Sequence, residues 1–272
     1  MLAQSGDERF CLKDTGAQRV SGAPDWAAAG SVIEWARFAG AAASRANIKA
    51  PNMADIRTDT AFAVRMTGAA DAEGFPAEQA WETAPPVRFN ADWQGKNSDA
   101  QRETQVRLLW NEGFLFLRFD ARYRNITVFA DGEASGRRNG LWDRDVCEVF
   151  LRPQGSHPSY YKEIEVAPNG MWLDLEIAPG QTNDLKSGMR RRVTLDEAGK
   201  QWHAVIALPM KSLVLRFEMP AVWRVNFFRV EGEAEPRFYS AWRPTNTAKP
   251  NFHVPEAFGA LVFTEPSSKI GE

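Results

Sequence analysis

The chain has 272 residues, of which 44% are apolar and 25% charged, values typical of a globular protein with a sizeable core. A formal net charge of −2 and a pI near 6.0 provide no basic field for nucleic acid or an anionic membrane. No apolar run approaches the roughly 18 residues that a membrane-spanning helix needs. We therefore expect neither nucleic acid nor a membrane among the partners of this protein.

The two cysteines and the first residues bear on the compartment. Cys11 lies in a polar segment and Cys147 in an apolar one, so a disulfide framework is not indicated, and Cys147 is expected to be a small buried apolar side chain. Residues 1–8 lack the basic and apolar regions of a signal peptide, so the sequence as given predicts no export signal. The compartment stays open, and is extracellular or periplasmic if a signal has been removed.

Residues 1–60 differ in composition from the remainder. They contain alanine-rich stretches at 27–29 and 41–43, and their apolar residues are only loosely periodic. This pattern predicts an N-terminal extension that is irregular or partly helical. Residues 61–272 are expected to form the folded domain.

From residue 61 onward, short strands alternate with turn residues. The predicted strands are 61–66, 105–110, 114–121, 145–151, 160–166, 171–177, 190–195, 201–208, 222–230, 237–242 and 258–263, with a single helical turn at 210–213. No helix is strong enough to cover a parallel sheet. The pattern predicts an all-β fold, an antiparallel β-sandwich of two sheets with about ten strands.

Two hairpins are clear within this series. A three-residue loop with a glycine, Asn111-Glu112-Gly113, joins strands 105–110 and 114–121, whose apolar residues alternate. The turn 167–170 joins strands 160–166 and 171–177. Alternation in the second of these strands places Trp172, Asp174 and Glu176 on one face, which is predicted to be wet, with the opposite face buried.

A tryptophan and a glutamate mark a candidate site at 141–151. Trp142 stands at the entrance to the apolar strand 146–151, and Glu148 lies within that strand. An unpaired buried charge costs several kcal/mol, so Glu148 must face solvent, a ligand, or an arginine such as Arg107 or Arg229. An exposed indole beside a carboxylate suits a sugar, which presents both a C–H face and hydroxyl groups.

From about residue 78 to 263 the chain resembles the family 9 carbohydrate-binding modules and their bacterial relatives. The resemblance rests on motifs in a fixed order: Ala80-Trp81 with Ala84, the 106–110 and 114–117 hairpin, Trp142 followed by Asp145 and 148–151, the hairpin from Tyr160-Tyr161 to Asn169-Gly170, 223–227 with Arg229, and Ser240-Ala241-Trp242 before Phe258-Gly259. It implies a β-sandwich module that grips a polysaccharide end or a small sugar, a role associated with carbohydrate catabolism.

The resemblance also implies which residues bind. Trp142 and Trp242 correspond to two clamps that stack on the sugar, and Glu148 to a carboxylate that accepts hydrogen bonds from its hydroxyl groups. Further candidates follow by proximity alone: Lys162, Glu163, Arg229, Tyr239 and Arg243. No cofactor is required. Members of the family bind structural calcium, for which Asp143 and Asp145 are candidate ligands.

Other functions stay open at this point. Glu163 with Glu165, or Asp174 with Glu176, would meet the ~5–9 Å separation of carboxylates in a glycoside hydrolase or a hydrolase accessory domain. Any solvated strand meets it too, so enzymatic activity is uncertain and the binding module is favoured. A third alternative is a structural or assembly sandwich whose tryptophans are core. His157, His203 and His253 lack metal-ligand spacing, although with methionines they would suit a haem.

Overall fold

The computed structural model describes residues 59–133 and 136–266, so the predicted N-terminal extension lies outside the described residues. The strands are β1 (Thr60–Arg65), β2 (Val87–Phe89), β3 (Thr104–Trp110), β4 (Phe114–Arg122), β5 (Val146–Arg152), β6 (Tyr161–Val166), β7 (Trp172–Ala178), β8 (Gln181–Asp184), β9 (Arg190–Asp196), β10 (Gln201–Pro209), β11 (Val222–Glu231), β12 (Phe238–Ala241) and β13 (Gly259–Thr264). Helix α1 (Met210–Leu213) is a single turn, and 3₁₀ helices lie at η2 (Glu78–Thr83), η3 (Ala100–Arg102), η4 (Leu141–Asp143) and η5 (Pro255–Ala257).

The strands form one connected hydrogen-bonded path in the order β8-β7-β6-β5-β11-β13-β1-β3-β4-β10-β9. β2 pairs with β3, and β12 with β11, off this path. β1 runs parallel to both β13 and β3, whereas the other pairs are antiparallel. The mostly-β fold predicted from the sequence is confirmed. Two separate sheets were expected, and β1 instead connects the two halves by pairing along both of its edges.

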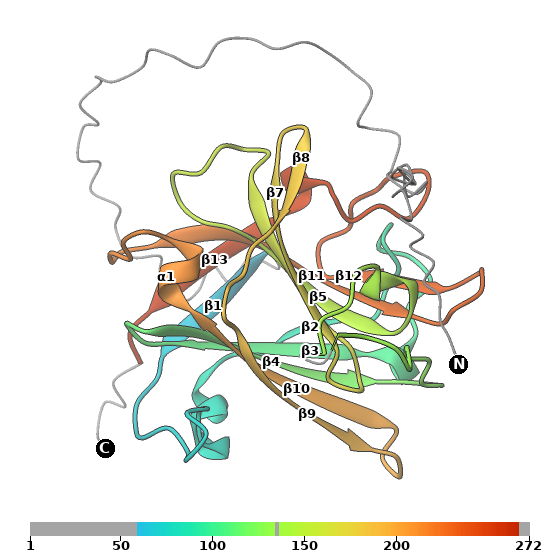
Figure 1. Ribbon diagram of the computed structural model, residues 1–272, viewed down its shortest axis with the longest axis horizontal. Helices are drawn as coiled ribbons and strands as arrows, with labels where there is room; N and C mark the ends of the chain where they lie inside the picture. The colour runs from blue at the N-terminus through green and yellow to red at the C-terminus, as the bar shows by residue number, and fades with distance from the viewer. Residues whose placement is uncertain (1–58, 134–135, 267–272) are drawn as a thin grey trace, which may run out of the picture. The chain divides into compact units, whose positions relative to one another are not determined.

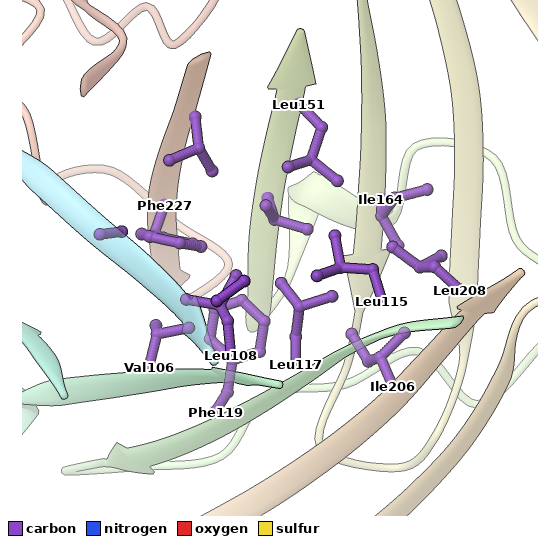
Figure 2. Close-up of a cluster of buried hydrophobic side chains, with 14 of the residues drawn as sticks. Val106, Leu108, Leu115, Leu117, Phe119, Leu151, Ile164, Ile206, Leu208 and Phe227 are labelled. Carbon is purple, nitrogen blue, oxygen red and sulfur yellow. The ribbon is translucent and has the colours of Figure 1, made fainter. Parts of the chain in front are cut away.

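The two halves of the path face each other across the main core. Figure 2 shows Leu151, Ile164 and Phe227, from β5, β6 and β11, pointing toward side chains of β3, β4 and β10 that include Leu117 and Ile206. In Figure 1, β4, β10 and β9 lie side by side in one half, and β5 and β11 lie next to each other in the other. Because each large apolar side chain contributes roughly 1.5–3 kcal/mol on full burial, this layer is the main support of the fold.

A second apolar cluster, named the outer cluster here, covers the outer face of β5, β6, β7 and β11. Phe150 and Phe228 belong to it, and Phe252 from the loop before η5 stacks on Phe228 with ring centroids 4.2 Å apart. β6 is therefore buried at every residue, and β5 at all but its last. Strands buried on both faces lose the alternation of apolar and polar residues that marks an exposed sheet.

The predicted hairpins are both present, as β3–β4 and β6–β7. The wet face predicted for β7 is wrong: Asp174 is buried, and Trp172 packs against the main core. Asp174 tolerates burial because its Oδ2 accepts a hydrogen bond of 2.7 Å from the Ser187 backbone N–H. β2 and β8 were not predicted, because strands of three and four residues are too short to show a period.

Among the described residues, no helix combines the length and apolar character needed to cross a membrane.

The start of β13 packs tightly, which gives a test of the fold. A Cβ added at Gly259 would lie 2.6 Å from both the Asp59 carbonyl oxygen and the Trp242 ring. We expect Gly259→Ala to lower the free energy of unfolding by about 1–3 kcal/mol, the usual cost of overpacking, measured by urea denaturation. Gly113→Ala is the control, since its Cβ would meet only the Asn111 side chain at 3.5 Å. Equal losses in the two variants would contradict this packing.

Candidate functional site

Trp142 is held at the surface by a short turn ahead of β5. Gly140 adopts the left-handed conformation, with φ of 68°, and leads into η4. Leu141 is fully buried in the outer cluster, and the next side chain, Trp142, is 41% exposed. The turn therefore places an exposed aromatic ring at the surface.

Three glutamates lie on the outer face of β5 and β6. In β5, Cys147 and Val149 face the main core, so Glu148 faces the outer cluster. Glu148 is paired across the strands with Glu165, and Glu163 lies two residues earlier on the same face of β6. Their side chains are almost inaccessible, with exposures of 2% for Glu148, 3% for Glu163 and 0% for Glu165.

The environment of Glu148 and Glu165 favours the neutral form of these two carboxyl groups. Burial, followed by the charge of Glu163, raises the pKa of Glu148 well above its ordinary value. Burial and the charges of Glu148 and Glu163 do the same to the pKa of Glu165. Glu148 Oε1 is buried and has no hydrogen-bond partner in the described structure. A protonated carboxyl group donates a hydrogen bond as well as accepting one, and Glu165 lies close enough to Glu163 for the two to share one.

Arg237 connects the tryptophan to the glutamates. Its Nη1 donates a hydrogen bond of 2.8 Å to the Trp142 carbonyl oxygen, and its charge acts to lower the pKa of Glu148 against the larger effect of burial. The guanidinium lies over the ring of Tyr239, 4.8 Å from its centroid. Asp143 of η4 is close enough for its charge to contribute to the raised pKa of Glu165. Trp142, Glu148 and Tyr239 therefore belong to one neighbourhood.

Aromatic side chains continue around this neighbourhood. Tyr239 contacts Trp93 and Phe252, each at a centroid distance of 6.2 Å. His253 Nδ1 lies 2.6 Å from the Tyr161 hydroxyl and 3.9 Å from Glu163 Oε2. The outer face of β5 and β6 thus combines aromatic rings with carboxyl groups.

The structure places other sequence-predicted residues elsewhere. The Trp242 ring packs on the Phe227 ring, with centroids 5.6 Å apart. Trp242 therefore lies against the main core, on the opposite side of β11 from the outer cluster. Lys162 lies on the opposite face of β6 from Glu163, where its Nζ bonds Tyr160 and Glu176 at 2.5 and 3.2 Å. The structure does not bring these two residues to Glu148.

Two arginines proposed from the sequence also have their own surroundings. Arg229 is entirely buried over the ring of Trp202 and pairs with Asp145 at 3.7 Å and with Glu231 at 3.4 Å. The Arg243 backbone N–H donates to Asn226 Oδ1 at 2.9 Å, which ties the loop after β12 to β11. Glu148 pairs with neither of the arginines considered for it, because Arg229 serves Asp145 and Arg107 lies beside Asp120.

The candidate calcium ligands differ in environment. Asp143 is exposed, whereas Asp145 is buried with Arg229 and accepts a hydrogen bond of 2.7 Å from the Gly232 N–H. Burial raises the pKa of Asp145 to about 6, against the opposing charge of Arg229. In the described ranges no group of three or more His, Cys, Asp or Glu side chains is arranged to hold a metal ion. The predicted calcium role stays a prediction.

Sequence reasoning missed two members of the neighbourhood. Glu165 was noted only as half of an acid pair, although its position two residues after Glu163 places both on one face. Arg237 precedes β12 in a polar turn and has no pattern that connects it with Trp142, 95 residues earlier. Pairing of β12 with β11 is what brings it there.

Residues 73–265 match the model of the family described as carbohydrate family 9 binding domain-like. The chain belongs to this family. The match spans most of the chain and confirms the family predicted from the sequence, and with it the predicted class of carbohydrate-binding module.

Relatives of this family member agree with the assignment. It is 24% identical over 178 residues to an extracellular protein of Arthroderma benhamiae, covering 59% of this chain and 78% of the relative. A proposed carbohydrate-binding protein of Bacteroides uniformis superposes with a TM-score of 0.60 at 15% identity, over 75% of this chain and 99% of that one. A family 9 module of Caldicellulosiruptor kristjanssonii, solved with cellotriose, gives a TM-score of 0.55 at 12% identity, over 78% of this chain and 97% of that one. The structural likenesses show a shared fold.

The buried carboxyl groups predict an unusual dependence of stability on pH. The folded chain keeps protons on Glu148 and Glu165 that the unfolded chain releases above about pH 4.5, the ordinary value for glutamate. The free energy of unfolding should therefore fall as pH rises from 4.5 toward the raised pKa of each group. We expect Glu165→Gln to make this fall smaller between pH 5 and 8, measured by urea denaturation at a series of pH values.

Glu82→Gln is the matched control, because Glu82 is exposed on η2. It should leave the pH dependence as it is in the unmodified chain. A Glu165→Gln profile that coincides with the Glu82→Gln profile would contradict the protonated state of Glu165 in the folded chain.

Proposed function

We propose that the chain binds a saccharide at the outer face of β5 and β6, by stacking on Trp142 and by hydrogen bonds to Glu148. The observation that carries the proposal is the exposed indole of Trp142 together with Glu148, which has Arg237 as a shared neighbour and whose buried Oε1 has no hydrogen-bond partner among the described residues. A sugar satisfies both, because its C–H face covers the ring and its hydroxyl groups bond the carboxyls. Such a module would serve carbohydrate catabolism by holding a polysaccharide.

The proposed contacts assign different roles to the predicted residues. Trp142 and Tyr239 provide aromatic surface, and Glu148 and Glu163 provide hydrogen bonds. Arg237 holds the Trp142 backbone in place and balances charge next to Glu148. Trp242, the second clamp implied by the resemblance, acts in this proposal through the core beneath the site. Lys162, Arg229 and Arg243 support the strands in the same indirect way.

The Caldicellulosiruptor kristjanssonii modules were solved with cellotriose and with glucose, which makes β-linked glucose oligomers the first ligands to test. One stacking ring and a few hydrogen bonds suit an affinity of roughly micromolar to millimolar. We expect cellotriose to change the intrinsic tryptophan fluorescence and Trp142→Ala to weaken binding at least about tenfold, the loss of ~1.4 kcal/mol.

Leu215→Ala is the control, since Leu215 is a fully exposed apolar side chain beyond α1 and outside the site. It should bind cellotriose as the unmodified chain does. Glu148→Leu removes both carboxyl oxygens at a similar size and should weaken binding while the chain stays folded by circular dichroism. The proposal is abandoned if no mono- or oligosaccharide of a panel alters the fluorescence, or if Trp142→Ala binds as well as Leu215→Ala.

A further inference from the structure

The outer face of the other half of the sheet carries a polar cavity that the proposed site does not use. The cavity measures about 420 Å³, within the range of small-molecule sites, and lies over β2, β3, β4 and β10. None of its nine lining residues is a Trp, Tyr or Phe, and none belongs to the Trp142 neighbourhood. It contains four arginines and two carboxylates, a positive balance in a chain whose net charge is −2.

Strand register builds this surface. One row runs straight across four strands, because Arg88 pairs with Gln105, Gln105 with Asp120, and Asp120 with His203. At a strand spacing of ~4.8 Å, the row is roughly 14 Å wide. Paired residues point to the same face, so the row forms a continuous polar platform that is long enough for more than one sugar ring.

A second row places two arginines directly opposite each other. Arg107 of β3 pairs with Arg118 of β4, an arrangement that like charges make unfavourable. Asp120 compensates for part of this, since its carboxylate lies 2.8 Å from Arg118 Nε and 3.6 Å from Arg107 Nη1. Arg107 Nε is buried and has no hydrogen-bond partner among the described residues. Arg118 has a second carboxylate partner in Glu78, so Arg107 is the less compensated of the two arginines among the described residues.

Asp120 also orients the histidine. Its Oδ1 lies 2.6 Å from His203 Nδ1. Burial acts to raise the pKa of Asp120, but the hydrogen bonds from His203 and Arg118 outweigh burial, so the pKa of Asp120 is lowered. The carboxylate is therefore ionised at neutral pH and fixes the ring through Nδ1. His203 lines the cavity and has its second ring nitrogen left for a ligand.

Two further arginines at the cavity are unpaired. Arg88 and Arg122 are exposed and form no ion pair within residues 59–133 and 136–266. Arg122 also lines a neighbouring cavity of about 580 Å³, with Tyr123, Arg124 and Lys200. A ligand with more than one negative charge would reach from one cavity to the other along Arg122.

We propose that this surface is a second binding site, specific for an acidic oligosaccharide whose carboxylate groups pair with Arg88 and Arg122. Guanidinium groups match the planar geometry of a carboxylate. Gln105, Gln201 and Glu103 supply the acceptors and amide donors that sugar hydroxyl groups require, which a site for a simple anion would not need. Without aromatic surface for stacking, a neutral sugar has little to hold it, so charge decides the ligand.

The test is calorimetric titration of the full chain with trigalacturonate, and with cellotriose as the neutral trisaccharide, at pH 7 and low salt. We expect trigalacturonate to bind, and the double variant Arg88→Gln/Arg122→Gln to weaken this binding at least tenfold. Arg216→Gln is the control, because Arg216 is exposed and pairs with Glu218 away from both cavities. It should bind trigalacturonate as the unmodified chain does.

Trp142→Ala separates this site from the one proposed above: it should lose cellotriose and keep trigalacturonate. Loss of both ligands in Trp142→Ala would overturn the second site. Failure of the unmodified chain to bind trigalacturonate would also overturn it, as would equal binding of trigalacturonate by the double variant and by Arg216→Gln. Polyglutamate and inorganic sulfate complete the test. If either competes with trigalacturonate at an equal concentration of charge, the surface recognises charge alone and the assignment to an acidic saccharide is wrong.

Discussion

Burial of β5 and β6 on both faces is the constraint on which the rest of the structure depends. One face joins the main core, where Val149 and Ile164 meet side chains of the opposite half of the sheet. The other face is covered by the outer cluster, in which Phe150 packs on Phe228. The glutamates of the outer face therefore lie in surroundings of low polarity. Burial, followed by the charges of the neighbouring glutamates, raises the pKa of Glu148 and of Glu165.

A buried ion pair fixes the start of β5 on the face of the sheet that points toward the main core. Asp145 and Arg229 are both fully buried, and Arg229 also contacts Glu231 and the Trp202 ring. Removing one partner of such a pair is costly, because the remaining charge stays buried without compensation. The pair joins the start of β5 to β11. The helical turn η4, which contains Trp142, directly precedes Asp145 in the chain. The position of the exposed indole thus depends on a charge pair that does not itself face a ligand.

The two outer faces of the molecule differ in chemistry although one sheet makes both. The face of β5 and β6 combines aromatic rings with neutral carboxyl groups, which suits hydroxyl-rich uncharged ligands. The face of β3, β4 and β10 combines arginines with Asp120 and His203, with no Trp, Tyr or Phe side chain in its cavity. A connected sheet whose halves face each other leaves two separate outer surfaces, so one domain has room for two kinds of ligand without a second core.

The sequence by itself determined the strands with a clear period, both hairpins, the family, and the pairing of Trp142 with Glu148 as a feature of interest, because these depend on residues near one another in the chain. It did not determine which face Glu165 and Asp174 occupy. Alternation shows that two residues share a face, and only the loops that pack on that face decide whether it is wet. The part played by Arg237 and the position of Trp242 likewise needed the tertiary structure. Each depends on the pairing of β11 with β5 and of β12 with β11. Local sequence does not specify this choice of partners among strands of similar apolar character.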